Sequence, residues 1–120
     1  MISNTMHYNS QTINNQQIAL YSNNETIITL NNFLDILVNA PAGTIAINRE
    51  QLDCQFFDLK TRIAGEMLQK VSNYQKRLII LGDFTDILSN SFHDFICESN
   101  KSGTIIFTDT LEKGVALLRK

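Results

Sequence analysis

The stretch Phe56–Lys70, FFDLKTRIAGEMLQK, decides the fold because it combines a dense apolar stripe with regularly spaced charges. Its apolar residues, together with the next valine, recur at the spacing of one helix face: Phe56, Ile63, Ala64, Met67, Leu68 and Val71. Charges of alternating sign recur every four residues, at Asp58, Arg62, Glu66 and Lys70, so neighbours are expected to form ion pairs of about 0.2–0.5 kcal/mol each. The stretch predicts a central helix from about Asp58 to Tyr74. Gly65 within it predicts close backbone packing, which would offset a cost of about 0.5–1 kcal/mol relative to Ala.

Three short apolar runs are typical of buried strands. Arg77–Leu81, RLIIL, is nearly continuous in apolar residues, as expected of a central strand covered on both faces. Thr44–Asn48, TIAIN, and Thr104–Thr108, TIIFT, are short and rich in β-branched residues. These runs predict the inner strands of one sheet.

The remaining segments predict a hairpin and three more helices. The hairpin runs from Met6 to Tyr21, with Asn14 and Asn15 in its turn, because Asn tolerates the positive φ angles of tight turns. The apolar spacing predicts helices over 27–38, 89–100 and from about 110 onward. Their candidate caps are Thr29 or Asn31 for the first, the pair Ser91 and Asp94 for the second, and Asp109 or Thr110 for the third.

The predicted order is β-β-α-β-α-β-α-β-α, which indicates an α/β fold. Strands that alternate with helices imply a mostly parallel sheet with right-handed crossovers, here of about five strands with about four helices. The first strand would be an antiparallel edge, since it belongs to a hairpin. A chain of 120 residues predicts one domain over 1–120, in which residues 1–5 form a flexible lead-in.

The composition narrows the class of protein. Hydrophobic residues make up 43% and charged residues 18%, which is ordinary for a globular protein and excludes disorder as the main state. A net charge of −2 without clustered Lys and Arg disfavours nucleic acid as a partner. The sequence lacks an apolar run long enough to span a bilayer and a secretory signal, so no membrane partner is predicted. Cys54 and Cys97 fit neither a disulfide framework nor a metal pair, which predicts reduced thiols in the cytoplasm.

A candidate binding surface lies around the start of the predicted central helix, at Asp58, Lys60, Thr61, Arg62 and Glu66. Free N–H groups and the helix dipole favour an anion at such a position, and Lys60 or Arg62 would assist. The structural alternative is that Asp58 caps the helix while the other charges form a solvated face. Both interpretations stay open on the sequence.

Asp83 is the candidate carboxylate if the protein has an active site. It follows the predicted central strand, and ligands bind at the carboxyl edge of open α/β sheets. Its structural alternative is to fix the turn at Gly82 through backbone hydrogen bonds.

Other chemistry has little support in the sequence. His93 and Cys97 share a helix face at metal-pair spacing, but no further His or Cys completes a set, so Cys97 is expected to be a small buried side chain. Cys54 lacks the motif partner of a catalytic thiol. Phosphate-binding glycine loops and the GxSxG elbow are absent. The sequence therefore predicts no metal, no cofactor and no catalytic residue.

Three blocks, FFDLKTRIAGEMLQK, NYQKRLIILGDF and DFICESNKSG, resemble a family of small bacterial proteins known as uncharacterised domain family 4180. They span most of residues 56–103. In the pattern of that family a Gly-Leu pair often follows the Lys-Thr pair, where this chain has Arg62–Ile63. The resemblance implies no particular reaction, because the family has no established activity.

The element order also resembles the STAS fold of anti-sigma-factor antagonists. There, the loop after the third strand carries an Asp-Ser-Ser-Gly-like motif with a phosphorylated serine. Laid beside that motif, its Asp resembles Asp58 and the phosphorylated serine falls at Lys60, which cannot take the phosphate; the hydroxyl of Thr61 lies one residue further on. The resemblance implies a STAS-like fold without the phosphoserine switch.

The leading hypothesis from the sequence is a non-enzymatic module that binds a protein through the surface around Asp58–Glu66. The second hypothesis is a small-molecule or anion site, with or without catalysis, at the carboxyl edge, supplied by Asp58, Lys60, Thr61 and Asp83. A third is self-association through a sheet edge or an exposed helix face.

Overall fold

The computed structural model describes residues 7–23 and 25–119, where the chain forms a five-stranded mixed sheet and four α-helices. The elements in chain order are β1 (Tyr8–Ile13), β2 (Gln16–Tyr21), α1 (Leu30–Asn39), β3 (Thr44–Asn48), α2 (Ile63–Asn73), β4 (Arg77–Leu81), α3 (Asn90–Ser102), β5 (Ile105–Thr108) and α4 (Leu111–Leu117). This is the predicted α/β order. The predicted lead-in, residues 1–5, and the predicted strand start at Met6 lie outside the described residues.

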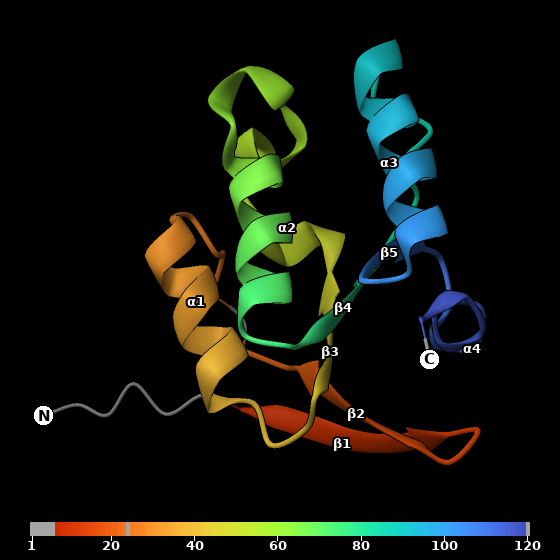
Figure 1. Ribbon diagram of the computed structural model, residues 1–120. Coiled ribbons are helices and arrows are strands. Elements are labelled where there is room, and N and C mark those ends of the chain that lie inside the picture. The colour runs from red at the N-terminus through yellow and green to blue at the C-terminus, as the bar shows by residue number, and fades with distance from the viewer. Residues whose placement is uncertain (1–6, 24, 120) are drawn as a thin grey trace, which may run out of the picture.

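The strands lie in the order β1-β2-β3-β4-β5, so neighbours in the chain are neighbours in the sheet (Figure 1). β1 and β2 pair antiparallel through a two-residue turn, in which Asn14 and Asn15 have φ angles of 51° and 67°. Two positive φ angles are the signature of the turn that matches the twist of a hairpin. The other pairs are parallel. The predicted antiparallel edge is therefore confirmed.

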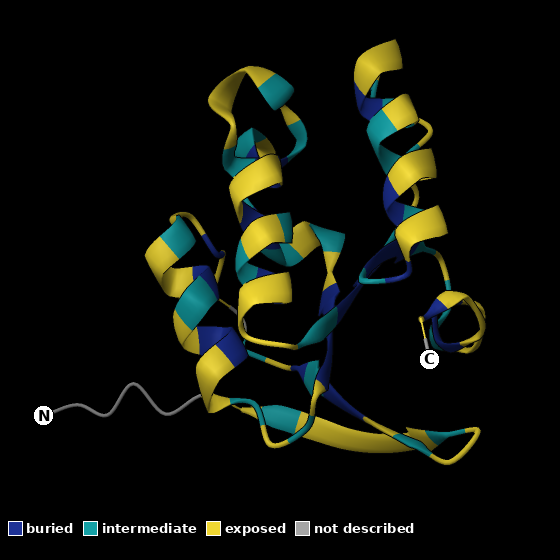
Figure 2. Ribbon diagram, viewed as in Figure 1, coloured by how far each residue is buried: buried dark blue, intermediate teal, exposed yellow. Residues whose placement is uncertain are grey.

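The two faces of the sheet are covered unequally. On one face α1, α2 and α3 bury the larger core, which includes Phe33, Phe56, Met67 and Phe92. On the other face the short helix α4 covers a smaller core of Ile18, Ala46, Ile79, Ile106, Val115 and Leu118. Figure 2 shows buried positions facing the sheet and exposed positions on the outer surfaces of α2 and α3. No helix in the described part of the chain is long and apolar enough to cross a membrane.

The structure of the stretch Phe56–Lys70 agrees with the prediction only in part. Its apolar stripe is buried or partly buried as expected, but α2 begins at Ile63 rather than near Asp58. Residues before it form three 3₁₀ turns, η1 (Arg49–Gln51), η2 (Cys54–Phe57) and η3 (Leu59–Thr61). Arg62 joins η3 to α2 with a left-handed backbone, φ 65° and ψ 0°. That conformation interrupts the helical geometry, so the four charges do not share one helix.

Two consequences of the predicted long helix are wrong. Among the described residues, no ion pair joins Asp58, Arg62, Glu66 and Lys70. A side chain at Gly65 would meet no atom within 4 Å, so the backbone there packs against nothing.

The structure shows which of the candidate residues cap the other three helices. Thr29 caps α1 by accepting from the Asn32 N–H, and Thr110 caps α4 by accepting from the Lys113 N–H. Ser89, rather than the pair Ser91 and Asp94, caps α3 by accepting from the Phe92 N–H. Its position just before the first helical residue is the one from which a short side chain reaches these N–H groups.

Candidate functional site

The carboxyl ends of β3 and β4 lie side by side, and two connections start there. The β3–α2 segment is residues 49–62, and the β4–α3 loop is residues 82–89. The parallel register pairs Asn48 with Leu81, so the first residue of each connection faces the other. Together they contain five of the six predicted site residues, and the sixth, Glu66, lies in the first turns of α2.

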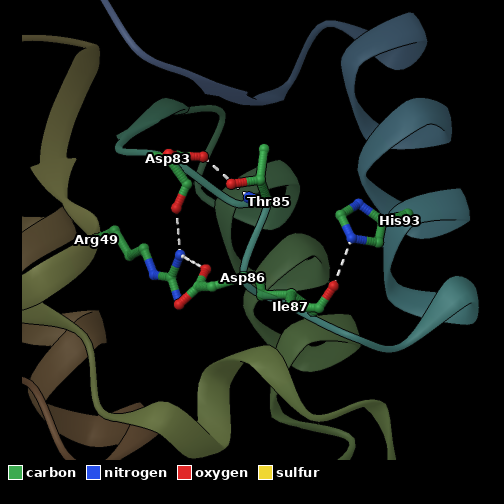
Figure 3. A network of polar contacts seen from close by, with 6 residues as sticks. All are labelled: Arg49, Asp83, Thr85, Asp86, Ile87 and His93. Carbon is green, nitrogen blue, oxygen red and sulfur yellow. Dashed lines mark hydrogen bonds and ion pairs between the residues drawn. The ribbon is translucent and has the colours of Figure 1, made fainter.

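Arg49 links the two connections (Figure 3). It follows β3 directly and extends beside Gly82, where an added Cβ would lie 2.8 Å from the Cβ of Arg49. The close approach explains why glycine occupies position 82. The guanidinium then reaches Asp86 with both ends, at 2.5 Å from Nη1 to Oδ1 and 3.0 Å from Nη2 to Oδ2. Nη1 also donates to the backbone carbonyl of Asp83.

Aromatic rings support the same guanidinium. Its carbon lies 5.3 Å from the ring centre of Phe57 and 5.5 Å from that of Phe84, within the range of cation–π attraction. The two rings are 6.2 Å apart, and they continue into the core through Phe92 and Phe107. The Arg49 side chain is 22% exposed, whereas that of Asp86 is 69% exposed. Arg49 is therefore a half-buried bridge from one connection to the other.

Two further contacts fix the β4–α3 loop. The Thr85 N–H donates to Asp83 Oδ1 at 2.9 Å, which is the turn-fixing role considered for Asp83 in the sequence. This bond is the main reason why the pKa of Asp83 is below its usual range. At the far end of the loop, Nε2 of His93 lies 2.6 Å from the carbonyl oxygen of Ile87. The hydrogen bond from Arg49 likewise lowers the pKa of Asp86.

The β3–α2 segment is held by its own side chains. Asp58 Oδ1 accepts from the Lys60 N–H at 3.0 Å and so caps η3 rather than α2. The hydroxyl of Thr61 lies 2.8 Å from the carbonyl oxygens of both Gln55 and Asp58. Below them, Phe56 is fully buried. These contacts use the polar groups of Asp58 and Thr61 to shape the turn.

The structure brings some of the predicted site residues together. Asp58, Lys60, Thr61 and Arg62 lie in one turn, and the Glu66 N–H donates to the Arg62 carbonyl. Asp83 lies on the other connection, and no hydrogen bond or ion pair in the described residues joins it to this turn. Lys60, Arg62 and Glu66 are exposed and form no ion pair with any described residue.

Sequence reasoning missed the role of Arg49 and of its partner Asp86. The available signal was an arginine directly after a buried strand, opposite the glycine that follows the next parallel strand. One expectation for a cysteine also changed. Cys97 is exposed, so its predicted burial is wrong. The described residues contain no group of three His, Cys, Asp or Glu side chains that could hold a metal ion.

A polar hollow of about 430 Å³ lies beside this site, at the carboxyl ends of β2 and β3. Its lining includes Asn9, Leu20, Thr26, Asn48 and Glu50, and none of the predicted site residues. The alternation of side chains in a strand places Leu20 and Asn48 on the face of the sheet that α4 covers. A concave surface therefore exists at the carboxyl edge of the sheet, but the predicted site residues do not line it.

Residues 13–118 match the family described as a domain of unknown function, DUF4180. The chain belongs to that family. The DUF4180 match extends well beyond the blocks in residues 56–103 and includes both connections of the site. No curated protein and no solved structure matches the chain, so the STAS likeness stays a resemblance in element order.

Proposed function

We propose that this DUF4180 chain is a non-enzymatic module that binds another protein and regulates it, without a phosphoserine switch. Its contact surface is the exposed part of the carboxyl edge around Lys60, Arg62 and Glu66. The observation that carries the proposal is that these three charges are exposed and form no ion pair among the described residues. Lys60 and Arg62 lie on a turn whose backbone is fixed, and Glu66 lies just after it in α2.

A fixed turn with unpaired charges suits recognition of a partner of complementary charge. Charged side chains at the rim of an interface steer the encounter and select the partner. Binding costs less conformational entropy when the backbone is already ordered, as it is here through Asp58, Thr61 and Phe56. The polar groups that chemistry would need are used to shape this turn, which favours binding over catalysis.

The test compares two triple variants in affinity capture. The site variant is Lys60→Glu with Arg62→Glu and Glu66→Lys. The matched control is Lys101→Glu with Lys113→Glu and Glu98→Lys, which makes the same change in net charge on exposed positions of α3 and α4. A partner recovered by the wild type and the control should be lost by the site variant, and with the purified partner the Kd should rise by about tenfold or more. Equal binding by all three proteins would exclude this surface.

A second candidate function is binding of a small polar molecule in the hollow beside β2 and β3. Its lining of amides, hydroxyl groups and Glu50 suits an uncharged or cationic ligand with several hydroxyl or amide groups. Ligand-observed NMR with a panel of polyols, sugars and amides would test it, with Glu50→Gln as the isosteric variant. Binding that weakens in this variant is expected, and no binding by the whole panel would contradict the idea.

A further inference from the structure

The two edges of the sheet differ in whether their outward backbone groups have partners. At β5, side chains of α3 form hydrogen bonds with these backbone groups. Asn100 accepts from the Phe107 N–H at 2.8 Å and its Nδ2 donates to the Phe107 carbonyl at 3.2 Å, while the Ser99 hydroxyl donates to the Ile105 carbonyl at 2.7 Å. Unpaired edges invite pairing with other chains, and proteins commonly cover them. The β5 edge is covered in this way.

In residues 7–23 and 25–119, nothing covers the β1 edge in this way. β1 ends the strand order, and Figure 1 shows no labelled element outside it. The Ser22 N–H donates to the His7 carbonyl, and alternate residues after His7 therefore face β2 while Ser10 and Thr12 face outward. Within the described residues, the backbone N–H and C=O groups of Ser10 and Thr12 have no partner. Both residues are exposed, and β1 is yellow along most of its length in Figure 2.

The sequence of β1, YNSQTI, also lacks the usual protection of an open edge. It carries no charge and no proline, the two features that most often prevent strand pairing. A second copy of β1 would meet no like charge, and its polar side chains can bond to one another. A strand with this composition is complementary to itself.

We propose that two copies of this chain pair antiparallel through β1, about a two-fold axis at Gln11. In this register Ser10 of each copy faces Thr12 of the other, and their outward N–H and C=O groups form four backbone hydrogen bonds. Gln11 faces its own counterpart in a pair without backbone hydrogen bonds, where Cα atoms lie about 4.5 Å apart. The result is one continuous sheet across both copies.

A cross-link tests the register. In the background Cys54→Ser with Cys97→Ser, which removes both exposed thiols, Gln11→Cys should form an intermolecular disulfide under mild oxidation. The separation of the two Cα atoms falls within the range that a disulfide requires, about 4.4–6.8 Å. Gln17→Cys, an exposed position on β2, is the matched control and should cross-link at least tenfold more slowly.

Sedimentation of the otherwise unaltered chain tests the association itself. The average mass should rise toward that of two chains as the protein approaches about 1 mM, a concentration that reports even weak pairing. Thr12→Pro removes one outward N–H per copy and should abolish the rise. Ser10→Lys places a charge on the β1 edge and should also abolish it. Ser72→Lys, which adds the same charge at an exposed position of α2, is the matched control and should leave the rise unchanged. A chain that stays monomeric, or a dimer unaffected by Thr12→Pro and Ser10→Lys, would overturn the proposal.

Discussion

The β3–α2 segment and the β4–α3 loop meet at the same edge of the sheet, yet they are held by different means. The β3–α2 segment is fixed by the buried ring of Phe56, by the hydrogen bonds of Asp58 and Thr61, and by backbone hydrogen bonds to Ile27. The β4–α3 loop has its own Asp83 turn and the ring of Phe84 packed on the core, and it is bound at its two ends by Arg49 and His93. The loop therefore depends on the segment through Arg49, whereas the hydrogen bonds of Asp58 and Thr61 within the segment do not involve the loop.

The largest effect should come from the anchor of the β3–α2 segment. Phe56→Ala removes a fully buried ring and should lower the free energy of unfolding by about 3–5 kcal/mol. Leu88→Ala is the matched change in the β4–α3 loop, where Leu88 is 93% exposed, and should alter stability by less than about 0.5 kcal/mol. Urea denaturation measures both. Similar losses in the two variants would contradict the exposure of Leu88.

The bridge between the two regions should have the next largest effect. Arg49→Met keeps an apolar stem but loses two ring contacts and the bond to the Asp83 carbonyl, which together contribute about 1–2 kcal/mol. Amide hydrogen exchange should speed up in residues 82–89 more than in residues 53–61. Arg49→Lys, which keeps the charge but not the planar fork, should give an intermediate result. Equal acceleration in both regions would contradict the one-way dependence.

The sequence predicted the inner strands of this site almost to the residue, because their apolar runs are local signals. β3 and β4 have the predicted bounds, and β5 differs only in starting at Ile105 rather than Thr104. The turn-fixing alternative for Asp83 was also readable, since its hydrogen bond spans two residues. Such features depend on near neighbours in the chain.

The missed features depend on distant neighbours or on backbone geometry. Arg49 contacts Asp83 and Asp86, which lie 34 and 37 residues away. The residues next to Arg49 in the sequence therefore do not identify its partners. The start of α2 was misplaced because Asp58 is of a residue type that caps α-helices, and here it caps a 3₁₀ turn instead. The charges recur every four residues through this turn, but that spacing brings side chains together only within one α-helix. The left-handed backbone of Arg62 interrupts the helix.

Arg62 allows a smaller and sharper test of the β3–α2 segment. A left-handed backbone costs a residue with a Cβ about 1–2 kcal/mol, whereas glycine adopts it without that strain. Arg62→Gly should therefore be more stable than Arg62→Ala by about 0.5–1 kcal/mol, after the greater freedom of unfolded glycine is subtracted. The Ala variant is the control, because both changes remove the charge and only one removes the Cβ. A Gly variant no more stable than the Ala variant would mean that the turn relaxes without strain.

The smallest effect concerns the two carboxylates of the β4–α3 loop. It separates the causes of their lowered pKa values. Arg49 is the main reason for the lowered pKa of Asp86, whereas Thr85 is the main reason for that of Asp83. Arg49→Met should therefore raise the pKa of Asp86 toward its ordinary value and leave most of the lowering at Asp83. NMR titration of the two carboxyl carbons measures both values in one experiment.

The sign of the pH dependence follows from these lowered values. A carboxyl group whose pKa is lower in the folded chain stabilises the fold at pH values above its unfolded pKa, and this contribution is lost as the pH falls through the folded pKa. Acid should therefore loosen the β4–α3 loop before the β3–α2 segment, since Asp83 and Asp86 both belong to the loop. In Arg49→Met most of the contribution of Asp86 should disappear, because its folded pKa then moves toward the unfolded value. Protection from amide exchange, corrected for the intrinsic pH dependence of the exchange rate, should fall first in the loop. An equal loss of protection in both regions would contradict this order, because it would place an acid-sensitive contact in the β3–α2 segment as well.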